Sequence, residues 1–230
     1  MIHQSEQTLE NDLVAQLVAG GYSKVDLPDE AAMLANLRWQ LETHNAAKLG
    51  GVALTDAEFK SVLNHLGRGT VFERAKTLRD KMHLVREDGS SVYLEFFNTS
   101  QWCQNEYQVA QQITNTGTYE TRYDVTILIN GLPLVQIELK RRGIELREAF
   151  NQINRYRRHS YSAGYGLFQY VQLFVISNGV DTKYYANTVS NNGDKKASYE
   201  FTYYWTDEQN VRMSELGQFA DIFLERCHLS

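Results

Sequence analysis

The sequence is poor in cysteine and proline, with two of each among its 230 residues. The cysteines, Cys103 and Cys227, lie far apart and lack the short spacing of zinc ligands, so we expect neither a zinc site nor a disulfide. A reducing, cytoplasmic environment is the plain interpretation of so few thiols. The prolines, Pro28 and Pro133, are too few to form a proline-rich linker.

Long apolar runs are also missing. The longest aliphatic stretch, Val125–Ile129, is interrupted by Thr126, so we expect no membrane-spanning segment. The N-terminus lacks the basic and then apolar pattern of a signal peptide. A net charge of −5 provides no overall attraction to nucleic acid, so any such attraction has to be local.

The chain does contain enough apolar residues to bury a sizeable core. Hydrophobic residues make up 43% and charged residues 22%, which is typical of a globular protein. No internal repeat or low-complexity segment divides the chain, and we predict a single domain over residues 1–230. Within it we distinguish a helical elaboration over 28–80, a sheet core over 81–205 and a closing helix over 211–227.

Helical patterns occupy the first third of the chain, and strand patterns occupy most of the rest. Polar caps and apolar periodicity predict the helices, including a capping box at Thr55. Short runs of β-branched and aromatic residues between turn sequences predict the strands. This order favours an α/β fold with a mixed sheet flanked by helices. We expect helices over 5–20, 29–44, 55–66, 144–159 and 211–227, a short helix from 71, and strands over 81–86, 92–97, 107–113, 125–129, 134–140, 170–177, 183–186 and 201–205.

The segment that carries chemistry joins Arg122-Tyr123-Asp124 to a strand that ends with Glu138 and Lys140. Because side chains alternate along a strand, Glu138 and Lys140 share one face. A carboxylate and an ammonium are therefore held side by side on a rigid element. Asp124, on the preceding strand, supplies a second carboxylate.

The turn between these two strands decides whether Asp124 reaches that face. A flat hairpin with a two-residue Asn130-Gly131 turn would put Asp124 on the wrong face. A three-residue loop puts it opposite Glu138, and Pro133 also argues against the tightest hairpin because it cannot donate a ladder hydrogen bond. We therefore predict a three- or five-residue loop, or a β-bulge.

Two neighbouring carboxylates repel each other and need a compensating positive charge. Mg2+ suits such a pair, because it binds one or two carboxylates, keeps several waters and accepts phosphate oxygens from a substrate. A metal there would polarise a phosphodiester and activate a water. Lys140 would orient that water or stabilise the negative charge that grows on the phosphate. The pattern predicts metal-assisted hydrolysis of phosphodiesters.

The helix expected after this strand supports that interpretation. Gln152 and Tyr156 are four residues apart and share a helix face. Positive charge is concentrated here in an otherwise acidic chain, as binding to a phosphate backbone requires. Between Glu138 and His159, basic residues stand at positions 140, 141, 142, 147, 155, 157 and 158, and acidic residues stand at 138, 145 and 148.

These motifs resemble the PD-(D/E)xK nuclease superfamily. Asp124 is followed by a gap of 13 residues and then by Glu138 and Lys140 in a Glu-x-Lys pattern. The spacing of Gln152 and Tyr156 is similar to the QxxxY motif of the RecB-like branch. The resemblance implies a restriction-endonuclease-like fold.

A longer run, from Arg122 to Lys140, is more specific. It resembles the restriction (R, motor) subunit of type I restriction-modification enzymes, and segments 148–156 and 173–179 fit the same family. The resemblance is dense over residues 105–190 and weaker elsewhere.

For that family, the resemblance implies Mg2+-dependent cleavage of double-stranded DNA far from the recognition site. It also implies assembly with methylation (M) and specificity (S) subunits, and ATP-driven translocation by helicase domains that follow the nuclease domain. This chain has no GxxxxGK[ST] loop and stops at Ser230, about where those domains would begin. We expect the nuclease domain of a type I site-specific deoxyribonuclease, which by itself neither hydrolyses ATP nor selects a DNA sequence.

The resemblance also assigns roles to individual residues. Asp124 and Glu138 match the metal-binding carboxylates, and Lys140 matches the catalytic lysine. Gln152 and Tyr156 match the QxxxY pair, which places DNA or the catalytic residues.

The family further uses a glutamate on the first helix. Glu6 is our choice, and Glu10, one turn on, is the alternative. Tyr123 stands where many members have proline, and we expect little loss because the carboxylate next to it is retained. The candidate DNA-contacting residues are Arg141, Arg142, Arg155 and Tyr156.

Two other interpretations stay open. The chain could be another RecB-like nuclease, such as an exonuclease or a junction resolvase. It could instead be a DNA-binding or assembly module with a silent catalytic core, although the intact Asp124, Glu138 and Lys140 argue against this. Helicase motifs after residue 230 in a full-length gene would exclude a free-standing resolvase.

Overall fold

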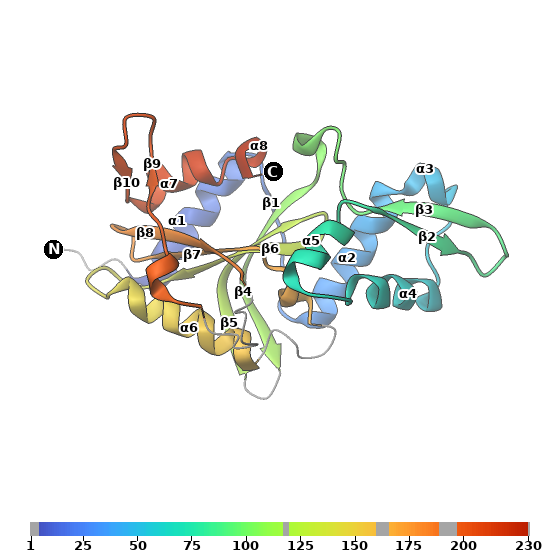
Figure 1. Cartoon of the computed structure of the whole chain (residues 1–230), viewed down its shortest axis with the longest axis horizontal. Coiled ribbons are helices and arrows are strands. Elements are labelled where there is room, and N and C mark those ends of the chain that lie inside the picture. The colour runs from blue at the N-terminus through green and yellow to red at the C-terminus, as the bar shows by residue number, and fades with distance from the viewer. Residues whose placement is uncertain (1–4, 117–119, 160–165, 189–196, 230) are drawn as a thin grey trace.

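The computed structural model describes residues 5–116, 120–159, 166–188 and 197–229, and its architecture is the mixed α/β fold expected from the sequence. A six-stranded sheet with the order β1-β4-β5-β6-β7-β8 forms its centre (Figure 1). β1 and β4 are parallel, as are β6 and β7, and the other neighbours are antiparallel. The strands are Ser23–Lys24 (β1), Tyr107–Thr116 (β4), Glu120–Ile129 (β5), Leu132–Leu139 (β6), Leu173–Ser177 (β7) and Thr182–Ala186 (β8).

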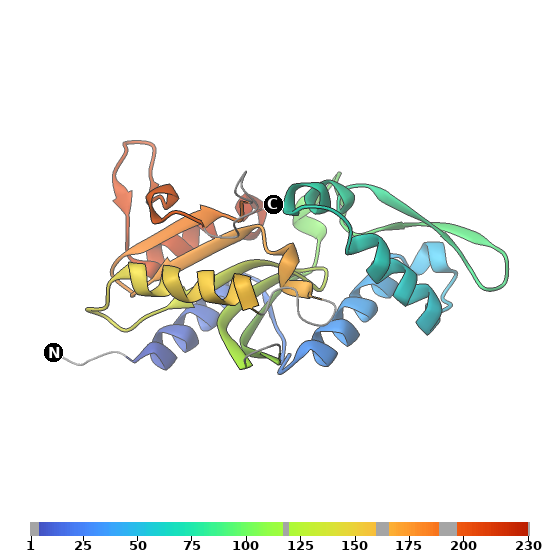
Figure 2. The same ribbon diagram turned by 60° about the horizontal axis from the view of Figure 1, so that its bottom comes forward.

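Helices cover both faces of this sheet, as a restriction-endonuclease-like fold requires. Helix α6 (Leu146–His159) packs on β6 and β7 from one side. Helices α1 (Glu6–Ala19) and α7 (Leu216–Phe223) pack against each other on the opposite side, as the two views together show (Figures 1 and 2). Because both faces are covered, β6 is buried along nearly its whole length.

The helix starts follow the caps expected from the sequence. Ser5 accepts a hydrogen bond from the Thr8 backbone and begins α1. At α4, Thr55 and Glu58 each bond the other's backbone, so the capping box is complete and the prediction is confirmed. The first half of the chain also contains α2 (Glu30–His44), α3 (Ala46–Leu49), α4 (Asp56–Leu66) and α5 (Val71–Thr77).

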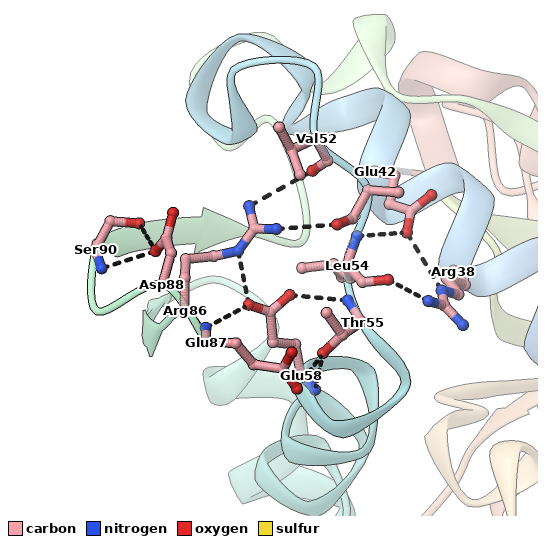
Figure 3. A network of polar contacts seen from close by, with 11 residues as sticks. Arg38, Glu42, Val52, Leu54, Thr55, Glu58, Arg86, Glu87, Asp88 and Ser90 are labelled. Atoms are coloured by element: carbon pink, nitrogen blue, oxygen red, sulfur yellow. Dashed lines mark hydrogen bonds and ion pairs between the residues drawn. The ribbon is translucent and has the colours of Figure 1, made fainter.

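A hairpin of β2 (Lys81–Val85) and β3 (Ser91–Glu95) joins these helices rather than the main sheet. It lies beside α3 and α4, away from the six-stranded sheet (Figure 1). Arg86, just after β2, forms an ion pair with Glu58 of α4 (Figure 3). It also donates a hydrogen bond to the carbonyl of Ala53. We call residues 30–95 the helical region. The main sheet therefore differs from the expected sheet core over 81–205: it does not contain β2 and β3, and it includes β1, which lies before that range.

The expected closing helix over 211–227 is wrong. Residues 212–213 form β10, which pairs with β9 (Trp205–Thr206), and the helix that follows is split into α7 and α8 (Arg226–Leu229). The Asp207 carboxylate accepts a 2.7 Å hydrogen bond from the Val211 backbone N–H. This bond stabilises a turn at Val211, where the sequence predicted the start of a helix. The expected strand over 201–205 is reduced to β9 and a single bridge between Tyr203 and Tyr184.

The expectation for the cysteines is also wrong. Cys103 and Cys227 form a disulfide that ties the short helix η1 (Trp102–Gln104) to α8, with 5.0 Å between the two Cα atoms. The two are 124 residues apart, and only the fold brings them together. The cysteine content therefore no longer supports a reducing compartment. No helix in the described part of the chain is long and apolar enough to cross a membrane.

Candidate active site

The hairpin of β5 and β6 sets the position of the expected catalytic residues. Its turn is the two-residue Asn130-Gly131 pair, with φ values of 48° and 83°, so the expected three- or five-residue loop is wrong. A register shift between Ile127 and Leu128 follows, and this confirms the alternative of a β-bulge. The bulge corrects the register that the tight turn alone would give.

Beyond the bulge, Val125 pairs with Ile137. Continued by one residue, this register sets Asp124 opposite Glu138. The Leu139 backbone N–H donates a 2.8 Å hydrogen bond to Asp124 Oδ2, which fixes this carboxylate against the end of β6. The two carboxylates that the sequence pointed to are therefore neighbours on adjacent strands.

Glu138 and Lys140 form the second part of the constellation. Lys140 Nζ lies 3.2 Å from Glu138 Oε1 and donates to the Leu139 carbonyl at 3.1 Å. The Glu138 side chain is fully buried, and its other oxygen, Oε2, has no hydrogen-bond partner among the residues that the structure describes. A buried carboxylate oxygen without a donor is costly for a folded protein unless a ligand satisfies it.

The pKa shifts of Asp124 and Glu138 also indicate that the two carboxylates lie close together in a buried place. Burial raises the pKa of Glu138 well above its ordinary value, the negative charge of Asp124 raises it further, and Lys140 opposes both. Burial likewise raises the pKa of Asp124, although the Leu139 amide and Lys140 lower it. Two acids that destabilise each other's charged form make a place that favours a cation.

Helix α1 brings two more carboxylates to this point. Glu6 Oε1 accepts a hydrogen bond from the Arg141 backbone at 3.1 Å, directly after Lys140. Glu10 is 4% exposed, and burial together with the charges of Asp124 and Glu6 raises its pKa. Both residues therefore lie at the site, and the geometry does not decide which of them is the first-helix glutamate of the family.

The QxxxY pair on α6 lies at the opposite side of the constellation. Gln152 donates to the Tyr156 hydroxyl, and that hydroxyl donates to the Arg122 carbonyl at 3.1 Å. Burial, and then the charge of Glu138, raise the pKa of Tyr156. The pair thus connects α6 to the start of the strand that carries Asp124.

The expected DNA-contacting arginines are accessible. Arg141, Arg142 and Arg155 are exposed, whereas the Tyr156 ring is largely buried. Another basic residue of α6, Arg157, is different: it is buried and donates to the Thr188 carbonyl at 2.8 Å. The local positive charge counted from the sequence therefore includes a residue that serves packing.

A family model described as the N terminus of the type I restriction enzyme R protein matches residues 3–193 of this chain. The chain belongs to this family. The matched range includes α1, the β5–β6 hairpin and α6, which together build the site.

Relatives of known name agree with the family. The chain is 49% identical over 230 residues to the type I restriction enzyme SsaAORF53P endonuclease subunit of Staphylococcus saprophyticus, a match that covers 100% of this chain and 24% of that protein. It is 48% identical to the SauMSSORF170P endonuclease subunit of Staphylococcus aureus, with the same coverage. It is 40% identical to the EcoprrI endonuclease subunit of Escherichia coli, over 97% of this chain and 71% of that protein. The chain spans about a quarter of the length of the staphylococcal relatives.

A divalent cation fits the donors that this family member presents. In the described part of the chain, no three acidic, histidine or cysteine side chains lie close enough to hold a metal by themselves. Two carboxylates, one with an unpartnered oxygen, suit Mg2+, which completes its shell with water and substrate oxygens. They suit zinc poorly, because zinc sites are built from three or four protein ligands.

Sequence reasoning missed two residues at the site. Arg122 lies two positions before Asp124 and lowers the pKa of both Asp124 and Glu10, and strand alternation could have put it on that face. Gln112 of β4 donates a hydrogen bond to Glu10 at 3.0 Å. Nothing in the local sequence around Gln112 indicates this contact.

Proposed function

We propose that this chain is the Mg2+-dependent endonuclease domain of a type I restriction enzyme and hydrolyses phosphodiester bonds of double-stranded DNA. The observation that carries the proposal is the buried Glu138 carboxylate, whose Oε2 lacks a donor although the strand opposite presents Asp124. A buried carboxylate oxygen without a donor is destabilising unless a ligand satisfies it. A bound cation would satisfy this oxygen and offset the repulsion between the two carboxylates.

Asp124 and Glu138 are the residues that would hold the metal. Their backbones lie on adjacent strands within a continuous hydrogen-bonded sheet, so little reorganisation is needed when the metal enters. When bound, Mg2+ supplies polarisation of the scissile phosphate and a lowered pKa of the attacking water.

Lys140 supplies the positive charge on the substrate side. Its ammonium is held by Glu138 Oε1 and by the Leu139 carbonyl, and no other described residue takes its third donor, which a ligand could use. That donor can orient the attacking water or stabilise the charge that develops on the phosphate. Tyr156 and Gln152 keep α6 fixed against the strand of Asp124.

The exposed arginines give DNA a path to this site. Arg141 and Arg142 directly follow Lys140, and Arg155 lies on the accessible side of α6. Contacts to phosphates through such residues position a duplex without reading its sequence. This agrees with an enzyme in which recognition belongs to another subunit.

The wider activity concerns more than this chain. We propose that cleavage occurs away from the recognition site, after ATP-driven translocation by other domains, in an assembly with methylation and specificity subunits. The names of the relatives support a multi-subunit restriction complex, since they are endonuclease subunits of type I restriction enzymes.

A cleavage assay of the full-length subunit, assembled with its methylation and specificity subunits in Mg2+ and ATP, tests the proposal. We expect Asp124→Ala, Glu138→Ala and Lys140→Ala each to abolish cleavage while ATPase activity is retained. Cleavage that survives one substitution would mean that this residue's role is misassigned. Survival of cleavage in all three would leave the domain as a binding or assembly module.

A further inference from the structure

Strand β4 has a backbone irregularity directly beside the candidate site. Gln112 has a φ of 53°, in the left-handed region that residues with a side chain rarely adopt. The residues on either side of it pair regularly with Val125 and Tyr123 of β5, so Gln112 itself lies opposite Asp124. The irregularity therefore occurs next to the first metal-binding candidate.

This conformation changes where the Gln112 side chain points. In a regular strand, consecutive side chains lie on opposite faces. Here Gln111 and Gln112 both reach α1: Gln111 donates to Asn11 at 3.0 Å, and Gln112 donates to Gln7 at 2.6 Å and to Glu10 at 3.0 Å. The left-handed residue is what brings the second amide to the same side as the first.

Glu10, the acceptor of this amide, is a buried acid that remains a candidate for the first-helix glutamate and has no other role in the proposed hydrolysis. Its described hydrogen bonds come from Gln112 and, at 3.4 Å, from Gln7. Burial and the charges of Asp124 and Glu6 raise its pKa, and the Gln112 hydrogen bond is the largest opposing influence. Without that amide, the Glu10 carboxylate would lose the shorter of its two described hydrogen bonds, 3.0 Å against 3.4 Å.

We propose that Gln112 is a positioning residue of the metal site, whose left-handed backbone turns its amide onto Glu10 and holds that carboxylate near Asp124. Held there, Glu10 accepts hydrogen bonds from the waters that Mg2+ retains, which strengthens metal binding without direct ligation. This inference rests on the proposed metal-dependent function.

The backbone strain at Gln112 allows its positioning role to be separated from its effect on stability. A left-handed conformation costs free energy for glutamine but not for glycine. Gln112→Gly therefore removes the amide and the strain together, whereas Gln112→Ala removes the amide and keeps the strain. Gln111→Ala is the matched control, because it deletes the neighbouring amide and its bond to α1 from a regularly paired position.

The experiment measures Mn2+ binding to the full 230-residue chain by electron paramagnetic resonance of the free ion, and melting temperatures in EDTA. We expect Gln112→Gly and Gln112→Ala each to weaken Mn2+ binding about tenfold, as loss of an outer-shell partner typically does. Gln111→Ala should bind as the wild type does. Gln112→Gly should melt at or above the wild-type temperature and above Gln112→Ala.

A double-mutant cycle tests whether the effect passes through Glu10. We expect Glu10→Gln to weaken Mn2+ binding and to leave little further loss for Gln112→Gly, because both remove the same interaction. Additive losses would overturn the route through Glu10. Wild-type Mn2+ affinity in Gln112→Gly, or a melting temperature for it below that of Gln112→Ala, would overturn the positioning role.

Failure of the proposed function would look different. Glu138→Gln would then bind Mn2+ as the wild type does, while Gln112→Gly would still bind it more weakly. A wild-type chain that binds no Mn2+ would overturn both the proposed function and the role of Gln112.

Discussion

Two buried glutamates, each beside a basic side chain, behave in opposite ways in the two halves of this molecule. In the helical region, Glu58 is 4% exposed and accepts from Arg86 at 2.8 Å, from the Thr55 backbone at 2.9 Å and from the Glu87 backbone at 3.1 Å (Figure 3). In the sheet, Glu138 is 0% exposed and, among the residues that the structure describes, accepts one hydrogen bond, from Lys140 at 3.2 Å.

The pKa shifts of the two acids follow these partners. Burial acts to raise the pKa of Glu58, but the hydrogen bonds from Thr55, Arg86 and Glu87 outweigh it and lower the pKa. For Glu138, burial and the neighbouring Asp124 prevail and the pKa is raised. The many hydrogen bonds of Glu58 are those of a structural ion pair. The raised pKa and few hydrogen bonds of Glu138 are the basis for our proposal that it holds a cation.

Glu138→Gln tests whether Glu138 is functional, and we expect it to have the largest effect, on DNA cleavage. Loss of a metal ligand should reduce DNA cleavage by the assembled enzyme by more than about 100-fold, because even outer-shell residues typically contribute 10–100-fold. The free energy of unfolding of the metal-free chain should stay the same or rise, since a poorly solvated charge is removed. A variant that loses stability as well as cleavage would make Glu138 a structural residue.

Glu58→Gln tests whether the ion pair of Glu58 with Arg86 serves stability alone. Removing one partner of a buried ion pair leaves Arg86 without its counter-charge, so we expect a loss of about 3 kcal/mol in the free energy of unfolding, measured by urea denaturation. Cleavage per folded molecule should stay at the wild-type level. A loss of cleavage with unchanged stability would place Glu58 in the functional machinery.

Gly131→Ala probes where the two regions meet. Gly131 has a φ of 83°, and an added Cβ would lie 2.8 Å from the Leu37 Cα of α2. We expect a loss of about 2 kcal/mol in the free energy of unfolding from backbone strain and this clash. Gly89→Ala is the matched control, because Gly89 has the same φ of 83° but no atom within 4 Å. An equal loss in both variants would mean that the contact with α2 contributes nothing.

The pH dependence of the Glu58 ion pair gives the smallest expected effect. Because its folded pKa is lowered, its stabilisation is complete above the unfolded value of about 4.3 and is lost as the pH falls through the folded value. The stability difference between wild type and Glu58→Gln should therefore be constant near neutral pH and shrink below about pH 4. Urea titrations at several pH values measure it, and a difference that grows in acid would contradict the sign.

The sequence was most informative where one segment alone determines the structure. The caps at Ser5 and Thr55 start their helices, because each depends on residues three positions away. The Glu138–Lys140 pair follows from strand alternation alone. The choice between a longer loop and a bulge in the β5–β6 hairpin stayed open, because the Asn130-Gly131 sequence favours a tight turn whereas the pairing of Asp124 with Glu138 requires a shifted register. The bulge between Ile127 and Leu128 allows both.

Contacts between segments that are distant in the chain could not be predicted from local sequence patterns. The disulfide joins cysteines 124 residues apart, and the left-handed Gln112 lies in a segment that reads as an ordinary strand. The buried Arg157 looks the same in the sequence as the exposed Arg155. Each depends on what the rest of the fold packs against it.

Whether Asp124 and Glu138 bind a metal can be measured without partner subunits, through the effect of Mg2+ on the free energy of unfolding. At about 100 times its dissociation constant, Mg2+ should stabilise the wild-type chain by about 2.7 kcal/mol. Glu58→Gln should retain this increment on a lower baseline, and Glu138→Gln should lose it. A wild-type chain that Mg2+ leaves unchanged, or a Glu138→Gln variant that gains as much as the wild type, would contradict the assignment of Asp124 and Glu138 as a metal site.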